Sequence, residues 1–176
     1  MYESLKKNDI RLFLLGLLSL IASAVWAYWP ALSGPFLFDD FANLDALAAF
    51  NNGFSWDAFE KYFMEGTAGP AGRPLSLLSF LINDSSWPSL PYSFKYTNLL
   101  IHVTNGLLLL MLQIRLVTKI TDDLTPSRLF IVFLVTSFWV LNPYHVSAVM
   151  YVVQRMALLA TSFVLLGLVL YVAGRE

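Results

Sequence analysis

Residues 12–29 read LFLLGLLSLIASAVWAYW, an apolar run without a charged side chain that ends in three aromatic rings. A hydrocarbon core about 30 Å thick requires about 20 apolar helical residues, and Trp and Tyr favour the headgroup boundary. The run therefore predicts a membrane span. The alternative is a cleaved signal peptide, with Lys6, Lys7 and Arg11 as its basic end and Ala22–Ala24 as its cleavage site. Because the apolar run continues past that site, we favour an uncleaved span.

The composition agrees with a protein that faces lipid. Of the 176 residues, 57% are hydrophobic and 13% are charged, whereas soluble domains average about 45–50% apolar and about 25% charged residues. A chain of this size cannot hide such an excess in a core. This excludes a soluble enzyme, a disordered tail and a secreted disulfide scaffold. The net charge of −1 argues against a nucleic-acid partner, and the absence of cysteine excludes disulfides and thiolate sites.

Three more apolar segments follow, so we expect an all-α, polytopic membrane helix bundle that forms a single membrane domain over residues 1–176. The four expected spans cover residues 12–29, 94–117, 128–141 and 156–172. Between the first two spans lies a long first outer loop, residues 30–93. Loops of that length are functional or disordered, and this one is rich in Phe and Trp, which argues against disorder.

The distribution of basic residues predicts the orientation. With the N-terminus in the cytoplasm, seven Lys and Arg lie inside and four lie outside, which satisfies the positive-inside rule. We therefore expect a multi-pass protein of a bacterial inner membrane or an equivalent membrane. The seven are Lys6, Lys7, Arg11, Arg115, Lys119, Arg128 and Arg175, and the four are Lys61, Arg73, Lys95 and Arg155.

Helical periodicity divides the outer loop into short elements. Apolar residues recur at helical spacing in residues 43–50 and 56–63, which predicts amphipathic juxtamembrane helices lying on the membrane surface. The stretch Leu75–Ile82 is apolar but too short to span. We expect it to be interfacial or buried beneath the spans.

Asp39 and Asp40 form the first candidate site. They are adjacent and flanked by apolar residues, so we expect them near the membrane surface. Two carboxylates in a partly dry site raise each other's pKa, and one can act as a general base or hold a cation. The alternative is that Asp40 caps a helix starting near Phe41. The pair permits a divalent cation but does not demand one.

The other candidates lie at span ends or inside spans. Asn98, His102 and Asn105 share one face of the second span, where polar residues mark a site or hold helices together; both interpretations stay open. Arg73 precedes an apolar helix and either clamps a phosphate or snorkels toward headgroups. We expect His145, Gln154 and Arg155, at the outer ends of later spans, to converge on the acid pair.

The order of these motifs resembles the N-terminal part of the GT-C membrane glycosyltransferases. The likeness is greatest to the transmembrane-and-tetratricopeptide-repeat O-mannosyltransferases and their bacterial relatives, and it covers nearly the whole chain. Its motifs are Phe38-Asp39-Asp40, Gly72-Arg73-Pro74-Leu75-Ser76, Tyr96-Thr97-Asn98-Leu99-Leu100-Ile101-His102, Asn142-Pro143-Tyr144-His145 and Val153-Gln154-Arg155-Met156.

This resemblance implies transfer of a sugar from a polyprenyl- or dolichyl-phosphate donor in the membrane lipid to a protein acceptor on the outer side. It implies that Asp39 or Asp40 is the general base or orients the acceptor. We assign donor-phosphate binding to Arg73 and Arg155, and His102 and His145 match polar positions of the family without an assigned role. Family members have many more spans followed by helical repeats, and often His-Pro at Asn142-Pro143. The alternative is therefore a non-catalytic membrane subunit, or a truncated relative that keeps the fold and needs further membrane subunits.

Overall fold

The computed structural model describes residues 7–65 and 73–175, and throughout this part the regular structure is helical. This confirms the all-α membrane helix bundle. The helices are α1 (Lys7–Tyr28), η1 (Trp29–Ala31), α2 (Asp39–Leu44), η2 (Asp45–Phe50), α3 (Trp56–Glu65), α4 (Pro74–Asn83), α5 (Pro91–Thr121), α6 (Pro126–Val140), α7 (His145–Met150), η3 (Val152–Gln154) and α8 (Arg155–Ala173).

Three stretches of the described chain are long and apolar enough to cross a membrane: Ile10–Ala31, Pro91–Thr121 and Val152–Ala173. The chain is accordingly a membrane protein. The span expected at residues 128–141 corresponds to α6, which has 15 residues and is therefore about 22 Å long, less than the hydrocarbon core. Pro126 opens α6, the Thr125 side chain accepts a hydrogen bond from Arg128 N, and the Asn142-Pro143 pair follows its end.

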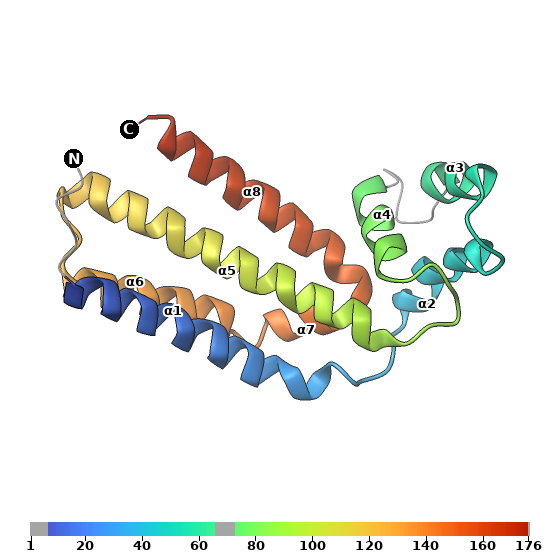
Figure 1. The fold of residues 1–176 in the computed structure, drawn as a ribbon, viewed down its shortest axis with the longest axis horizontal. Helices are drawn as coiled ribbons and strands as arrows, with labels where there is room; N and C mark the ends of the chain where they lie inside the picture. Colours follow the sequence, from blue (N-terminus) through green and yellow to red (C-terminus); the bar gives the residue numbers. More distant parts are fainter. Residues whose placement is uncertain (1–6, 66–72, 176) are drawn as a thin grey trace.

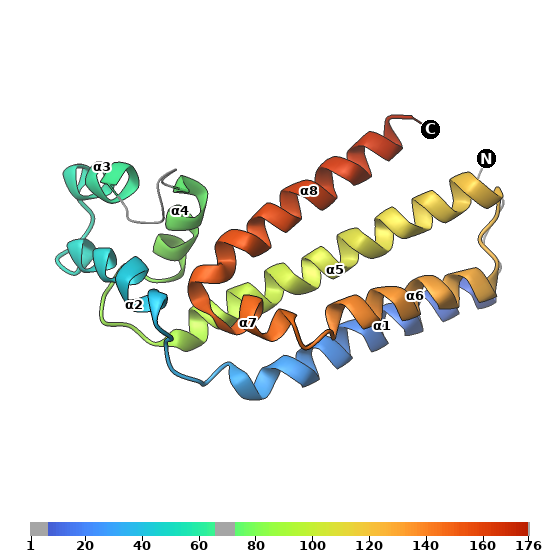
Figure 2. The ribbon, with the colours of Figure 1, turned by 180° about the vertical axis from the view of Figure 1, so that it is seen from behind.

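The long helices run side by side, and helices consecutive in the chain are antiparallel (Figures 1 and 2). α5 is central, with α8 on one side and α1 with α6 on the other. α1 begins, α5 joins α6, and α8 ends at one end of this bundle. The outer-loop helices α2, η2, α3 and α4 form a separate group beyond the opposite end. We call this group the outer module.

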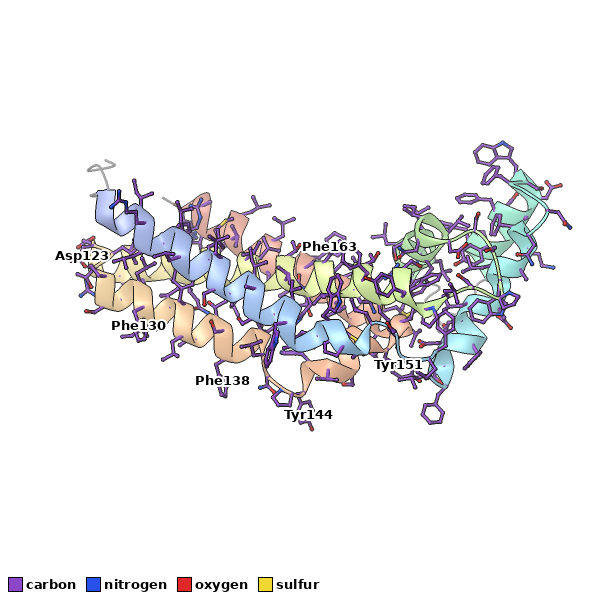
Figure 3. All side chains as sticks on the ribbon, turned by 60° about the horizontal axis from the view of Figure 1, so that its bottom comes forward. Asp123, Phe130, Phe138, Tyr144, Tyr151 and Phe163 are labelled. Atoms are coloured by element: carbon purple, nitrogen blue, oxygen red, sulfur yellow. The ribbon has the colours of Figure 1, made fainter. Side chains whose placement is uncertain are left out.

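Small residues let the bundle helices approach closely. A Cβ atom on Gly106 of α5 would lie 2.6 Å from Val140 Cγ2 of α6, and one on Gly16 of α1 would lie 2.8 Å from the Phe133 ring. Close backbone approach of this kind drives helix association in lipid. The opposite faces remain apolar and exposed, and Figure 3 shows Phe130 and Phe138 pointing away from the bundle.

The outer module has its own hydrophobic core. Its buried residues Leu44, Leu47, Phe50, Tyr62, Leu77 and Phe80 pack with Phe94 of α5 and Val152 of η3. This corrects the prediction that the amphipathic faces of residues 43–50 and 56–63 lie on the membrane surface, because Leu44, Leu47 and Tyr62 face protein. It also shows α4, which contains the stretch Leu75–Ile82, to be partly buried within that core.

The basic residues separate between the two ends of the bundle. Arg115, Lys119, Arg128 and Arg175 lie at the end where α5 meets α6, and Arg128 forms an ion pair with Asp123 there. Lys119 Nζ at the same end donates to the carbonyl of Arg175. Lys61, Arg73, Lys95 and Arg155 lie in or against the outer module. The two groups of basic residues that the sequence analysis distinguished therefore lie at opposite ends of the bundle.

Candidate functional site

The two adjacent acids have opposite environments. The Asp40 carboxylate is fully buried; Oδ2 accepts from Leu37 N over 2.9 Å and Oδ1 accepts from Val153 N over 2.8 Å. Asp40 thus fastens the start of the outer module to η3, rather than capping a helix near Phe41, since α2 already begins at Asp39. Asp39 is exposed, and its carboxylate contacts no hydrogen-bond or ion-pair partner among the described residues.

The electrostatics of Asp40 follow from this burial. Loss of water raises the pKa of the Asp40 carboxyl group, while the N–H groups of Leu37, Val153 and Val152 and the charge of Lys95 oppose that rise. The buried Lys95 ammonium donates to the carbonyls of Gly34 and Pro35, each over 2.9 Å. Asp40 and Lys95 together therefore hold the chain that leads from α1 into the outer module.

Arg155 is also fully buried, at the first residue of α8. Nε donates to Asn98 Oδ1 over 2.7 Å, Nη1 donates to the Ser79 carbonyl over 2.8 Å, and Nη2 donates to the Phe94 carbonyl over 2.8 Å. The guanidinium also lies 4.8 Å from the centre of the Phe80 ring. These contacts join α4, α5 and α8, and the assignment of Arg155 to donor phosphate is corrected: its N–H groups are occupied by the protein.

Arg73 remains available. It is exposed, it adopts the left-handed conformation (φ 37°, ψ 57°) immediately before α4, and Nη1 lies 2.9 Å from Met156 Sδ. A thioether is a weak acceptor, so this contact leaves the guanidinium able to bind an anion. Gln154, also exposed, ends η3 two residues before Met156.

Asp39 and Arg73 contact the same short segment of the chain. The Asp39 N–H donates to Tyr151 Oη over 2.9 Å, and Arg73 contacts Met156. Five residues of chain span at most about 18 Å, which bounds the distance between the Cα atoms of Tyr151 and Met156. Residues 39 and 73 of the outer loop thus contact the segment that leads from α7 into α8. We call Asp39, Arg73 and Gln154, together with residues 151–156, the outer site; Figure 3 labels Tyr151, the residue that Asp39 contacts.

The histidines belong to a different cluster. His102 is buried, and its Nε2 donates to the Val140 carbonyl over 2.9 Å, because a carbonyl can only accept. Nδ1 is buried without a partner in the described part of the chain. The His102 ring lies 5.2 Å from that of His145 and 5.3 Å from that of Trp139. Burial lowers the pKa of His145. The expected convergence of His145 with the acid pair is not observed.

The shared helical face of Asn98, His102 and Asn105 is confirmed, and each residue links helices. Asn98 Nδ2 donates to the carbonyls of Tyr151 and Val152. Asn105 Nδ2 donates to the Leu158 carbonyl, and its Oδ1 accepts from Ser162 Oγ over 2.6 Å. Of the two interpretations of this face, the contacts correspond to interhelical hydrogen bonding.

The acid pair offers little to a divalent cation. Both Asp40 oxygens accept backbone N–H groups, so among the described residues Asp39 is the member of the pair with an exposed carboxylate. Within residues 7–65 and 73–175, no group of three or more His, Cys, Asp and Glu side chains is placed to hold a metal ion. These residues therefore do not fit a metal centre.

Two residues that fix the site were missed by sequence reasoning. Tyr151 carries no motif that would single it out. Lys95 does give a signal, because a lone ammonium at the head of a long apolar helix needs acceptors when that helix is buried. Comparison with known proteins adds nothing to this geometry: no family model, no curated protein and no solved structure matches the chain.

Proposed function

We propose that this chain is a membrane glycosyltransferase of the GT-C type, or its N-terminal module, acting on the extracytoplasmic side. It transfers a sugar from a polyprenyl-phosphate donor to a protein hydroxyl. The observation that carries the proposal is the outer site. The backbone of Asp39, whose carboxylate is exposed, and the exposed guanidinium of Arg73 contact one short segment at the mouth of a membrane bundle.

The chemistry follows from these two groups. Asp39 accepts the proton of the acceptor hydroxyl as that oxygen attacks the anomeric carbon of the sugar. The bond between that carbon and the phosphate oxygen breaks, and the lipid phosphate leaves with the electron pair. Arg73 stabilises the charge developing on the phosphate. Gln154 supplies an amide for hydroxyl groups, and Asp40, Lys95 and Arg155 position the outer module.

The proposed orientation places the outer module outside the cell and the N-terminus in the cytoplasm. It is supported by the separation of Arg115, Lys119, Arg128 and Arg175 from the outer module, since cytoplasmic ends of spans carry the excess of Lys and Arg. It also puts the outer site beside the leaflet in which a flipped lipid-linked donor would present its sugar.

The test is a transfer assay on the full chain in proteoliposomes, with radiolabelled polyprenyl-phosphate sugars and a Ser/Thr-containing peptide. Asp39→Asn should lose transfer by at least about a hundredfold, the scale of one general base, and Arg73→Ala should raise the KM for donor. Asp57→Asn, which alters another exposed acid of the outer module, is the matched control and should transfer normally. Normal transfer by Asp39→Asn would remove the proposed base.

A second candidate is a non-catalytic membrane subunit that uses the same fold for assembly. It is favoured by the exposed apolar faces of α1 and α8, which include Leu12, Leu15, Leu18, Phe163, Val164 and Leu170. These faces can take lipid or further membrane helices. If the purified chain neither binds nor transfers any donor, while crosslinking in membranes captures a second membrane protein through α1 or α8, this candidate replaces the first.

A further inference from the structure

Phe38 has the most unusual backbone and side chain of the outer site. Its φ is 30° and its ψ is −98°, and it is one of three non-glycine residues with positive φ in the described chain. A residue with a Cβ atom adopts such a conformation only when its surroundings impose it. The residue is 84% exposed. The fold therefore holds an apolar ring outward at a conformational cost.

The neighbours of Phe38 explain how this conformation is held. Leu37 N donates to Asp40 Oδ2, Asp40 N donates to the Leu37 carbonyl over 2.8 Å, and Asp39 N donates to Tyr151 Oη. The residues on both sides are thus fixed to buried or anchored partners. Phe36, two residues earlier, packs inward on Trp87 and Phe94. Phe38 therefore differs from Phe36, and it is also more exposed than Leu37 and Phe41, which are 38% and 53% exposed.

An exposed aromatic ring beside a membrane bundle can contact either the membrane surface or a sugar. The outer module disfavours the membrane, because the carboxylates of Asp39, Asp45, Asp57 and Glu60 are exposed on it and a charged group loses favourable hydration when it enters an apolar layer. A sugar suits the neighbourhood of Phe38. Its hydroxyls hydrogen-bond to a free carboxylate such as that of Asp39, and its electropositive C–H face lies against the negative face of an aromatic ring.

We propose that Phe38 is a stacking platform for the sugar ring handled at the outer site, with the Asp39 carboxylate bonding to the hydroxyls of that ring. This inference rests on the proposed function, and it names the part of the substrate that Phe38 and Asp39 recognise together. The strained backbone turns Asp40 into the protein while it leaves the ring of Phe38 and the carboxylate of Asp39 outside.

The positive φ of Phe38 allows a variant that removes the ring without straining the backbone. Glycine accepts a positive φ without steric cost, so Phe38→Gly removes the ring without lowering the unfolding temperature. Phe38→Trp keeps an aromatic face, and Phe138→Ala, which removes a 76% exposed ring from α6, is the control. Loss of one aromatic stacking contact weakens binding by about tenfold. We expect Phe38→Gly to raise the donor KM by that factor, Phe38→Trp to raise it less because an aromatic face is kept, and Phe138→Ala to stay near wild type.

A second readout does not depend on turnover. Saturation-transfer NMR on the purified full chain, with methyl glycosides of mannose, glucose and N-acetylglucosamine as probes, should show glycoside contact that Phe38→Gly abolishes. If transfer occurs and Phe38→Gly leaves both the KM and the NMR contact unchanged, the platform is refuted and the proposed function stands. If Phe38 binds a glycoside but no transfer is measured, the function fails and the platform stands. The chain already has five tryptophans, so the wild type is the baseline; extra fluorescence of Phe38→Trp over that baseline that brominated lipids quench would place the ring in the membrane and overturn the platform.

Discussion

The Asn98 side chain and the Arg155 guanidinium form a buried hydrogen bond, with 2.7 Å between Oδ1 and Nε. Asn98 in turn donates to the carbonyls of Tyr151 and Val152, just before the start of α8. One polar contact thus joins the head of α5 to the head of α8, and Arg155 extends it to α4 through Ser79. We call this set, Asn98, Arg155 and Ser79, the polar clamp.

The polar clamp predicts a large stability effect at Asn98. Asn98→Leu leaves Arg155 Nε buried without an acceptor, and a buried donor without a partner costs about 1–3 kcal/mol, more when it is charged. Arg155→Lys should cost at least as much, because one ammonium cannot replace a planar group that reaches three acceptors. Chemical unfolding in detergent measures both. Arg175→Lys, at the other end of the bundle, is the control, and an Arg155→Lys protein as stable as wild type would refute the clamp.

The burial of Arg155 could not be predicted from the sequence, although the spans and one polar helix face could. Hydropathy located the spans, and helical spacing placed Asn98, His102 and Asn105 on one face, because both depend on local order along the chain. Whether a cation is free or enclosed depends on acceptors that arrive from distant segments. Ser79 and Phe94 lie 76 and 61 residues from Arg155 in the chain. No pattern in the sequence marks either of them as an acceptor.

Asp39 and Asp40 are adjacent in the chain, yet their different environments also depend on a distant segment. Adjacent residues of a helix point in different directions, so one of Asp39 and Asp40 could be expected to face inward. Which one does so is decided by the N–H of Val153, 113 residues away. The short α6 could be predicted from Pro126 and the Asn142-Pro143 pair, which bound it. The packing of η2 and α3 against α4 could not, because an amphipathic face looks the same whether it meets protein or lipid.

Asp40 and Asp39 should therefore respond differently to the same substitution. Asp40→Asn places an amide where two backbone N–H donors, from Leu37 and Val153, converge, so one donor loses its acceptor and the protein loses about 1–3 kcal/mol of stability. Asp39→Asn changes an exposed group and should leave stability within about 0.5 kcal/mol of wild type. Urea unfolding of both variants measures the difference. Equal stabilities for the two would contradict the assigned environments.

His145 predicts a dependence of stability on pH. Burial lowers the pKa of His145 below its ordinary 6.5 in the folded protein. When the pH falls below 6.5, the unfolded chain therefore binds a proton before the folded chain does, and stability decreases. The loss should be small, because His145 is half-exposed. His145→Gln cannot take up the proton, so its stability should decline less on acidification; an identical decline in wild type and variant would remove His145 as a cause.

The contact between Gly106 and Val140 predicts that no side chain larger than that of glycine fits at residue 106, where α5 crosses α6. Gly106→Ala places a Cβ 2.6 Å from Val140 Cγ2, and overpacking of this kind costs about 1–3 kcal/mol. Val140→Ala in the same chain should recover part of that loss by removing the methyl group that clashes. Gly167→Ala is the matched control, because nothing lies within 4 Å of its added Cβ. Thermal unfolding in detergent checks all three, and a Gly106→Ala protein as stable as wild type would refute the close crossing.

The proposed orientation can be tested cleanly because the chain has no cysteine. Ser85 lies in the outer module and Ser127 lies at the end where α5 joins α6, and both are exposed. With the outer module outside the cell, Ser85→Cys should react with a membrane-impermeant maleimide in intact cells. Ser127→Cys should react only after the membrane is permeabilised, since the basic residues near it favour the cytoplasm. The reverse pattern would move Asp39 and Arg73 to the cytoplasmic face, where a donor displayed on the outer leaflet could not reach them.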